Sequence, residues 1–459
     1  MVLKMAQDTI AAIATPVAQG GIGIVRISGS EAMAVGDAVF KTNRGVSLTK
    51  IQAYSAALGH AYCGEQMIDQ CIALVFRAPR SYTGEDVVEL QCHGGVYIMR
   101  RILEAALLAG ARLAGAGEFT ARAYLNGRID LTSAEAVMDM ISAKGEQAAA
   151  AAIAQHEGAL FRRISKIKAA LYDISADICA FVDFPEEDIP ELGAPVLQRR
   201  LAEIDGELIR CIETYDKGRI QREGIKAVIA GKPNVGKSTL MNLIAGYEKS
   251  IVTPIPGTTR DIVEESVYFA GCPLILADTA GLRDTIDLIE SIGVGRARSR
   301  LDMAELVFAV FDASCLLDDE DKALLELIKN KRAVVVINKS DLPNKIDKLY
   351  IRDRNKQIVE IAAISGEGIE ELEKVTAGLL AASDLDTGNG IIANERQLEC
   401  VRAASEGIRA ALAALEDGIT LDAVSTGIEQ AVAELAMLTG ERASQEIIER
   451  VFEKFCVGK

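Results

Sequence analysis

Short apolar runs alternate with helix-like segments through one long stretch of the chain, residues 218–382. Mainly apolar runs lie at positions 225–230, 274–277 and 333–337, and positions 239–245 have the spacing of a helix. Alternation of this kind is typical of α/β domains with an open sheet. We therefore predict an α/β domain over residues 218–382.

The N-terminal part of the chain has a different pattern. Positions 22–27 alternate as a strand does, positions 87–91 form another short strand-like run, and positions 98–108 have the helical period. Strands and helices thus follow each other without the long regular alternation seen later in the chain. Residues 1–125 are expected to form a mixed α/β domain.

The remaining segments, residues 126–217 and 383–459, read as long helices without strand signals. The first helix is expected to start at a capping box formed by Thr132 and Glu135. The simplest arrangement is one helical domain in two pieces, with the α/β domain inserted between them, since insertion is tolerated where chain ends lie close together. The fold class is therefore a multidomain protein that combines α/β and all-α parts.

A glycine-rich stretch, Gly-Lys-Pro-Asn-Val-Gly-Lys-Ser at positions 231–238, follows the first apolar run of the α/β domain. A strand, a glycine-rich turn and a helix in this order form a phosphate-binding loop, whose N–H groups point at one anion. Lys237 can reach the β- and γ-phosphates of a nucleotide, and the Ser238 hydroxyl can bind Mg²⁺. A chance glycine-rich turn is the alternative, and the motifs downstream argue against it.

Two further motifs close the later strands. In residues 278–281, Asp-Thr-Ala-Gly, Asp278 can hold Mg²⁺ through water and the Gly281 N–H can contact the γ-phosphate. In residues 338–341, Asn-Lys-Ser-Asp, the Asp341 carboxylate can accept hydrogen bonds from N1–H and the 2-amino group of guanine, which adenine cannot offer. Open α/β sheets bind ligands at such strand ends. The three motifs together predict GTP binding.

Composition excludes several other classes of protein. A net charge of −16 argues against a generally basic nucleic-acid binder, because neutralising phosphates requires clustered Lys and Arg. Nine scattered cysteines without CxxC pairs and only three histidines favour reduced thiols over disulfides or a zinc site. No apolar run approaches the ~20 residues of a membrane span, and no signal peptide is recognisable. A cytoplasmic protein without membrane contact is expected.

The order of segments and motifs resembles the MnmE (TrmE) family of bacterial tRNA modification GTPases, over essentially the whole chain. The most specific marks are the phosphate-binding loop, Gly-Thr-Thr-Arg-Asp at 257–261, Ser-Tyr-Thr-Gly-Glu-Asp at 81–86 and the C-terminal Cys-Val-Gly-Lys at 456–459. The resemblance implies a homodimer that joins the FAD-dependent flavoprotein MnmG (GidA) in a heterotetramer. The complex would install a carboxymethylaminomethyl-type group at C5 of the wobble uridine, U34, of certain tRNAs.

The resemblance also implies a tetrahydrofolate derivative, 5-formyl or 5,10-methylene, as the source of the one-carbon unit. Family members hold it in the N-terminal domain, which also mediates dimerisation. The matching contacts here are Arg26, Glu89, Arg128 and Lys459. Taken by position alone, Arg26 and Glu89 could equally be paired surface charges, and Arg128 stands where relatives can have Lys. Cys456 is a candidate for a catalytic role, with packing at a helix end as the alternative.

Hydrolysis needs a group that orients water, and Leu282 stands where Ras-like enzymes have glutamine. The next carboxylates are Asp284, Asp287 and Glu290, which the sequence alone does not separate. The resemblance assigns the role to Glu290.

No arginine finger is identifiable, so another cation is expected near the transferred phosphate. Asn234 offers a side-chain oxygen there, and the resemblance implies a K⁺ ion bound by Asn234, Thr253, Ile255 and Thr258 when two GTPase domains meet. Mg²⁺ is expected on Ser238 and Thr259. The residues expected to contact GTP are Asn234, Val235, Gly236, Lys237, Ser238, Thr239, Thr253, Pro254, Ile255, Pro256, Gly257, Thr258, Thr259, Asp278, Thr279, Ala280, Gly281, Asn338, Lys339, Asp341 and Ala363.

Within this set, Ala363 is expected to offer its N–H to O6 of guanine. The alternative function from another class is a GTP-switched RNA-binding or ribosome-assembly factor. Such a factor would need no folate site and no flavoprotein, and it predicts a basic RNA-binding appendage that the acidic composition does not supply.

Overall fold

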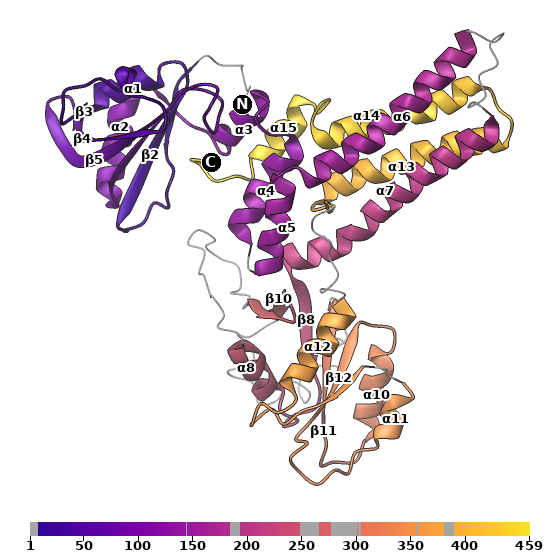
Figure 1. Ribbon diagram of the computed structural model, residues 1–459. Helices are drawn as coiled ribbons and strands as arrows, with labels where there is room; N and C mark the ends of the chain where they lie inside the picture. The colour runs from indigo at the N-terminus through magenta and orange to yellow at the C-terminus, as the bar shows by residue number, and fades with distance from the viewer. Residues whose placement is uncertain are drawn as a thin grey trace. The chain divides into compact units, whose positions relative to one another are not determined.

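The computed structural model describes residues 8–143, 145–183, 193–247, 266–276, 301, 304–354, 357–380 and 390–459. By contacts the chain divides into two compact units, whose elements are labelled in Figure 1. The first unit contains residues 1–138, 155–199 and 406–459, and the second contains residues 139–154 and 200–405. No helix in the described part of the chain is long and apolar enough to cross a membrane.

The strands of the N-terminal sheet are β1 (Ile10–Ile13), β2 (Ile22–Ser28), β3 (Phe40–Thr42), β4 (Ser55–Cys63), β5 (Gln66–Phe76), β6 (Val87–His93) and β7 (Arg112–Leu113). Its helices are α1 (Ala32–Val39), the 3₁₀ turn η1 (Leu48–Lys50), α2 (Val96–Leu108) and α3 (Glu118–Leu125). The strands lie in the order β3-β4-β5-β6-β2-β1-β7. The strands predicted at 22–27 and 87–91 and the helix predicted at 98–108 are confirmed as β2, β6 and α2.

Alternation along β2 explains how this sheet is built. Val25 and Ile27 are fully buried in the core that α1 and α2 also enter. Arg26 lies between them and therefore points to the opposite face of the sheet. The antiparallel register pairs Arg26 of β2 with Glu89 of β6, so the pleat alone makes these two charged residues cross-strand neighbours.

The helical segments are α4 (Leu131–Ser142), α5 (Glu146–His156), α6 (Ala159–Asp183), α7 (Ala194–Glu223), α13 (Glu395–Glu416), α14 (Leu421–Thr439) and α15 (Gln445–Phe452). In the first unit, α14 packs beside α6 (Figure 1). Close packing also requires glycine where α13 meets α14, because a Cβ on Gly407 would lie 2.8 Å from the Gly427 carbonyl oxygen. In the second unit, Ser405 of α13 hydrogen-bonds to Asp205 of α7.

The capping box predicted at Thr132 and Glu135 is wrong. Asp130 precedes α4, and its Oδ1 accepts hydrogen bonds from the N–H groups of Thr132 at 2.8 Å and Ser133 at 3.1 Å. Thr132 already lies in the first turn of the helix, where its own amide needs a partner. Asp130, two residues earlier, satisfies that amide, which leaves Thr132 no capping function.

The α/β part of the second unit contains β8 (Ile225–Ala230), α8 (Lys237–Tyr247), β9 (Ser266–Phe269), β10 (Cys272–Leu276), β11 (Leu306–Asp312), α10 (Asp319–Ile328), β12 (Ala333–Asn338), α11 (Lys348–Arg352), β13 (Ile358–Glu360) and α12 (Ile369–Leu380). The strand order is β13-β12-β11-β8-β10-β9, and only β9 is antiparallel to its neighbour among the described strands. The strands predicted at 225–230 and 333–337 are confirmed as β8 and β12.

Both faces of this sheet are covered. Along β11, Phe308 and Val310 enter the core shared with α8 and α12, whereas Val307, Ala309 and Phe311 enter the core shared with α10 and α11. The chain order reverses at β8, which lies between β10 and β11. In open α/β sheets the crevice at such a reversal is where ligands bind. The boundary predicted between residues 217 and 218 falls inside α7, which continues to Glu223.

Replacing Asp130 with Ala is expected to lower the free energy of unfolding by about 1 kcal/mol, because two amides of the first turn of α4 lose their acceptor. Asp130→Asn is the matched control and should retain most of the stability, since its amide oxygen can still accept. Urea unfolding of both variants measures the difference. An Asp130→Ala variant as stable as the wild type would contradict the capping role.

Candidate functional site

The loop between β8 and α8 has a curled backbone that requires glycine at two positions. Gly231 and Gly236 have φ values of +151° and +100°, and Asn234 has a φ of +62°. A Cβ on Gly231 would lie 2.4 Å from the Val310 carbonyl oxygen, and one on Gly236 would lie 2.1 Å from Asn338 Nδ2. Side chains at either glycine would therefore push the loop off the strands beneath it. The curled backbone leads directly into the first turn of α8, whose free N–H groups can bind an anion.

Lys237 is the first residue of α8, and its side chain folds over the loop. Its Nζ donates to the carbonyl oxygens of Gly231 at 2.8 Å and Lys232 at 2.7 Å. Burial lowers the pKa of Lys237 below its ordinary value, and a cation that is costly to bury has a strong affinity for a bound phosphate. Ser238 and Thr239 follow in the first turn, with Ser238 exposed.

Asn338 joins the phosphate-binding loop to the loop after β13. It ends β12 and is only 3% exposed. Its Nδ2 donates to the Val235 carbonyl oxygen at 2.8 Å, and its Oδ1 accepts from the Ala363 N–H at 3.0 Å. The Ala363 amide expected to meet guanine O6 is thus the donor to Asn338 in this structure. Asp341, the residue expected to select guanine, is exposed.

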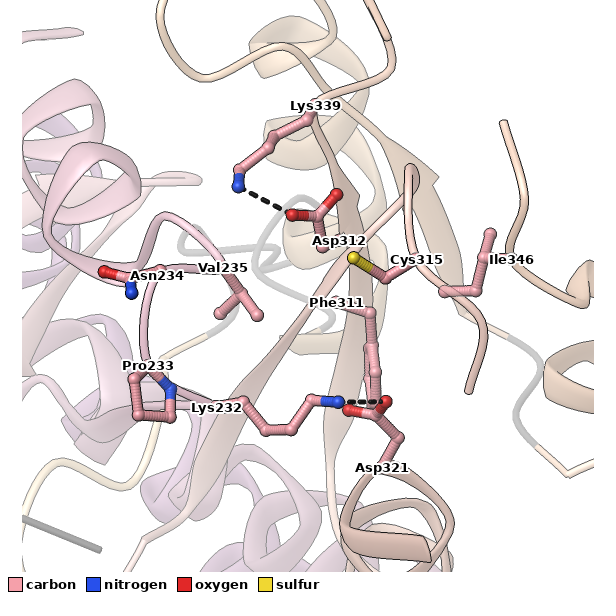
Figure 2. Close-up of a pocket in the computed structure, with 10 residues that line it drawn as sticks. All are labelled: Lys232, Pro233, Asn234, Val235, Phe311, Asp312, Cys315, Asp321, Lys339 and Ile346. Atoms are coloured by element: carbon pink, nitrogen blue, oxygen red, sulfur yellow. Dashed lines mark hydrogen bonds and ion pairs between the residues drawn. The ribbon is translucent and has the colours of Figure 1, made fainter. Parts of the chain in front are cut away.

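Two ion pairs line a cavity of about 320 Å³ beside the loop. Figure 2 shows Lys339 reaching Asp312 on one wall and Lys232 reaching Asp321 on another. Lys339 Nζ lies 2.6 Å from Asp312, and Lys232 Nζ lies 2.7 Å from Asp321. Burial alone would raise the pKa of Asp312, but hydrogen bonds from Lys339 and Ser314 hold it below its ordinary value.

Sequence reasoning did not single out Lys232, Asp312 or Asp321. A signal for Asp312 was present, because it ends the apolar run of β11 just as Asn338 ends that of β12. The other expected nucleotide residues at positions 253–259 and 278–281, together with Glu290, lie outside the described residues.

A second cluster of site residues lies on the face of the N-terminal sheet opposite the core that contains Val25 and Ile27. Arg26 Nε donates to Glu89 Oε1 at 2.8 Å, and both side chains are less than one-fifth exposed. The Arg26 guanidinium also lies over the rings of Tyr82, at 5.7 Å, and Phe119, at 5.5 Å. Partial desolvation strengthens such cation–π contacts. The sequence indicated neither ring as a partner of Arg26.

The C-terminal tail reaches the same cluster through its backbone. Arg26 Nη1 donates to the Gly458 carbonyl oxygen at 3.4 Å, and the Phe119 N–H donates to the backbone oxygen of Lys459 at 3.1 Å. Gly458 has a φ of +99°, and a Cβ there would lie 2.3 Å from the Ile13 carbonyl oxygen. Cys456 is exposed. The structure therefore brings Arg26, Glu89 and the tail together.

Arg128 belongs to the rim of this cluster. Its Cγ lies 3.3 Å from where a Cβ on Gly84 would be, and Gly84 has a φ of +79°. Gly84 lies in the same short loop as Tyr82, whose ring is next to Arg26. The Arg128 side chain thus lies beside the loop that also carries Tyr82.

A glycine-constrained loop between a parallel strand and a helix, with a lysine at the helix start and polar residues at the ends of β11 and β12, defines the nucleotide site of a P-loop GTPase. Two family patterns match the chain: "MnmE helical domain" over residues 131–456, and "GTP-binding protein TrmE N-terminus" over residues 9–128. The chain belongs to the MnmE (TrmE) family of tRNA modification GTPases.

Individual relatives found by sequence agree with this assignment. The tRNA modification GTPase MnmE of Symbiobacterium thermophilum is 44% identical over 459 residues, covering 99% of this chain and all of that protein. That of Alkaliphilus oremlandii is 40% identical over 457 residues, covering 98% and 99%. Among solved structures, the G domain of the T. maritima FeoB iron transporter is 27% identical, covers 34% of this chain and 98% of that one, and has a TM-score of 0.25.

This chain is therefore a GTP hydrolase that acts in tRNA modification. The alternative of a ribosome-assembly factor finds no support among these relatives.

Lys237→Ala is expected to reduce GTP hydrolysis by about 10²-fold or more, because a preorganised charge on the transferred phosphate is lost. The thermal unfolding midpoint should change little, since the loop carbonyls that Lys237 contacts can turn to water. Lys226→Ala, an exposed residue of β8, is the control and should hydrolyse GTP at the wild-type rate. Wild-type turnover by Lys237→Ala would remove the loop from the active site.

Proposed function

We propose that this GTPase is a cytoplasmic homodimer that works with an FAD-containing flavoprotein of the MnmG (GidA) type. Together they install a carboxymethylaminomethyl-type group at C5 of the wobble uridine, U34, of certain tRNAs. A tetrahydrofolate derivative, 5-formyl or 5,10-methylene, supplies the one-carbon unit from a site in the N-terminal domain. GTP hydrolysis is stimulated by K⁺ and requires Mg²⁺.

The observation that carries the folate proposal is the meeting of Arg26, Glu89 and the C-terminal tail. A carboxylate such as that of Glu89 can accept hydrogen bonds from the amino and ring N–H groups of a pterin. The Tyr82 and Phe119 rings around Arg26 provide apolar surface for a flat heterocycle. Arg128 and Lys459 are cations of the kind that bind the carboxylates of a folate tail.

The tail is suited to hold its last residues at a fixed place. Phe452 and Phe455 are buried against Ala121 and Leu131, so the segment before the tail is anchored by apolar contacts. The backbone of Cys456 then accepts from the Gly117 N–H at 3.3 Å. Anchoring on both sides orders Cys456 and Lys459 without using their side chains, which leaves those side chains available to the site.

The nucleotide site supports the cation proposal through its charges. Among the described residues of the loop, Lys237 is the cation placed over the site, and Lys232 is already neutralised by Asp318 and Asp321. Asn234, exposed at the tip of the loop with a positive φ, presents an amide oxygen suited to a hard monovalent ion. K⁺ bound there would supply the positive charge that an arginine finger supplies in other GTPases.

Arg26→Ala is expected to weaken binding of 5-formyltetrahydrofolate to the full-length protein at least about tenfold, because a charged hydrogen-bond partner in a partly buried site is lost. Isothermal titration calorimetry measures the affinity. Cells whose sole copy carries Arg26→Ala should also lack the modified wobble uridine in nucleoside analysis of their tRNA.

The matched control for that experiment is Arg101→Ala, which removes an arginine paired with Glu104 on the surface of α2 and should leave folate binding intact. A wild-type protein that binds no folate, or that sediments as a monomer, would refute the proposed N-terminal site and dimer. Equal folate affinities of wild type and Arg26→Ala would remove Arg26 from the site.

Exchange of Na⁺ for K⁺ at constant ionic strength is expected to raise GTP hydrolysis steeply, by less than the ~10³–10⁵ of an arginine finger. Asn234→Ala should lose this response and still bind GTP, since Lys237 and the loop amides remain. Glu290→Ala should slow hydrolysis in both salts, because it would act on water and not on charge. Equal wild-type rates in Na⁺ and K⁺ would refute the function of K⁺ in hydrolysis. Arg260 and Arg283 would then be the next candidates for the cation near the transferred phosphate.

A further inference from the structure

The Asp312 carboxylate at the end of β11 has two oxygens with separate contacts. Oδ1 accepts hydrogen bonds from the N–H of Ser314 at 2.9 Å and from its Oγ at 2.7 Å. Oδ2 accepts from Lys339 Nζ at 2.6 Å (Figure 2). The Asp312 side chain is 12% exposed and that of Lys339 is 29% exposed. One oxygen therefore fixes the turn after β11, and the other fixes a lysine from the neighbouring strand end.

The backbone on both sides of this ion pair is hydrogen-bonded in the sheet. Asp312 and Asn338 are register partners across β11 and β12, and the Ala313 N–H donates to the Asn338 carbonyl oxygen at 2.8 Å. Lys339 follows directly with a φ of +62°, so the chain turns sharply at that residue. A long side chain leaving a sharp turn has many rotamers open to it. The Asp312 carboxylate selects one of them.

That rotamer places Lys339 between the two halves of the nucleotide site. Its side chain lines the same cavity as Asn234 and Val235 of the phosphate-binding loop. The residue before it, Asn338, is hydrogen-bonded to that loop, and two residues after it comes Asp341, the base-selecting carboxylate. The Lys339 stem and ammonium group thus form part of the wall that a guanine nucleotide would meet.

We propose that Asp312 is a positioning residue for guanine-nucleotide binding. It holds Lys339 against the wall of the site, so that the side chain is ordered before the nucleotide arrives and less conformational freedom is lost on binding. Asp312 does not touch the nucleotide, and its effect passes through Lys339. The inference rests on GTP binding at the loop between β8 and α8.

Asp312→Asn separates the two functions of the carboxylate. The amide oxygen can keep the hydrogen bonds to Ser314, whereas the amide NH₂ would face Lys339 Nζ as a second donor. In the full-length protein, release of fluorescently labelled GDP is expected to become about tenfold faster, the size of effect that loss of a charge-assisted hydrogen bond produces. The thermal unfolding midpoint should stay close to that of the wild type.

Two further variants make the result specific. Glu360→Gln breaks the ion pair between Lys348 of α11 and Glu360 of β13, which has a similar length of 2.7 Å, and should change GDP release less than about twofold. Lys339→Met keeps an apolar stem and removes the ammonium group. In that background, Asp312→Asn should have no further effect, because the group through which it acts is gone.

Each outcome decides the matter. Independent, additive effects of Asp312→Asn and Lys339→Met would overturn the proposal, as would a lower unfolding midpoint with unchanged GDP affinity. Tighter GDP binding by Asp312→Asn would also overturn it, since Asp312 would then compete with the nucleotide for Lys339. A wild-type protein that binds no GDP would instead refute the nucleotide site itself, which distinguishes the two failures.

Discussion

The nucleotide site depends on the side chain of Asn338. One buried amide donates to the Val235 carbonyl oxygen and accepts from the Ala363 N–H, so it ties the phosphate-binding loop and the loop after β13 to the end of β12. An unpaired amide at this depth would cost about 1–3 kcal/mol for each unsatisfied group. Gly236 is glycine because of the same residue, since a Cβ there would meet Asn338 Nδ2. The Asn338 side chain therefore fixes both the curvature of the phosphate-binding loop and the position of the loop that carries Ala363.

Much of this arrangement could be predicted from the sequence, because it is local. The glycines, Lys237 and the motif that contains Asn338 mark strand ends in chain order, and β8, β12 and α8 formed where apolar runs indicated. The wrong prediction of a capping box at Thr132 also came from a local sequence signal. The expected box followed a sequence rule, but Asp130, only two residues earlier, offered a charged acceptor to the same amides. Local sequence rules identify the possible capping residues, and the backbone geometry at the start of the helix determines which of them caps it.

Contacts between distant segments could not be predicted in this way. Nothing in the spacing of the chain shows that the backbone of Gly458 will contact Arg26. Nor does it show that Phe455 packs against Gly117, where a side chain would not fit because its Cβ would lie 2.8 Å from the Cβ of Phe455. Those contacts follow from how the tail docks in the first unit, which depends on packing. The resemblance to a family supplied Arg26, Glu89, Arg128 and Lys459 as a set. Tyr82 and Phe119, which surround the Arg26 guanidinium, carried no signal by themselves.

The two sites share one arrangement of paired side chains. In both, a long cationic side chain is held by a carboxylate on the adjacent strand: Arg26 by Glu89 across β2 and β6, and Lys339 by Asp312 across the ends of β12 and β11. Strand pairing fixes the separation of the two backbones, so only the side chains need ordering. Both carboxylates are less exposed than the cations they hold. Because the carboxylate comes from a strand more than 20 residues away in sequence, its contact with the cation becomes visible only once the register of the sheet is known.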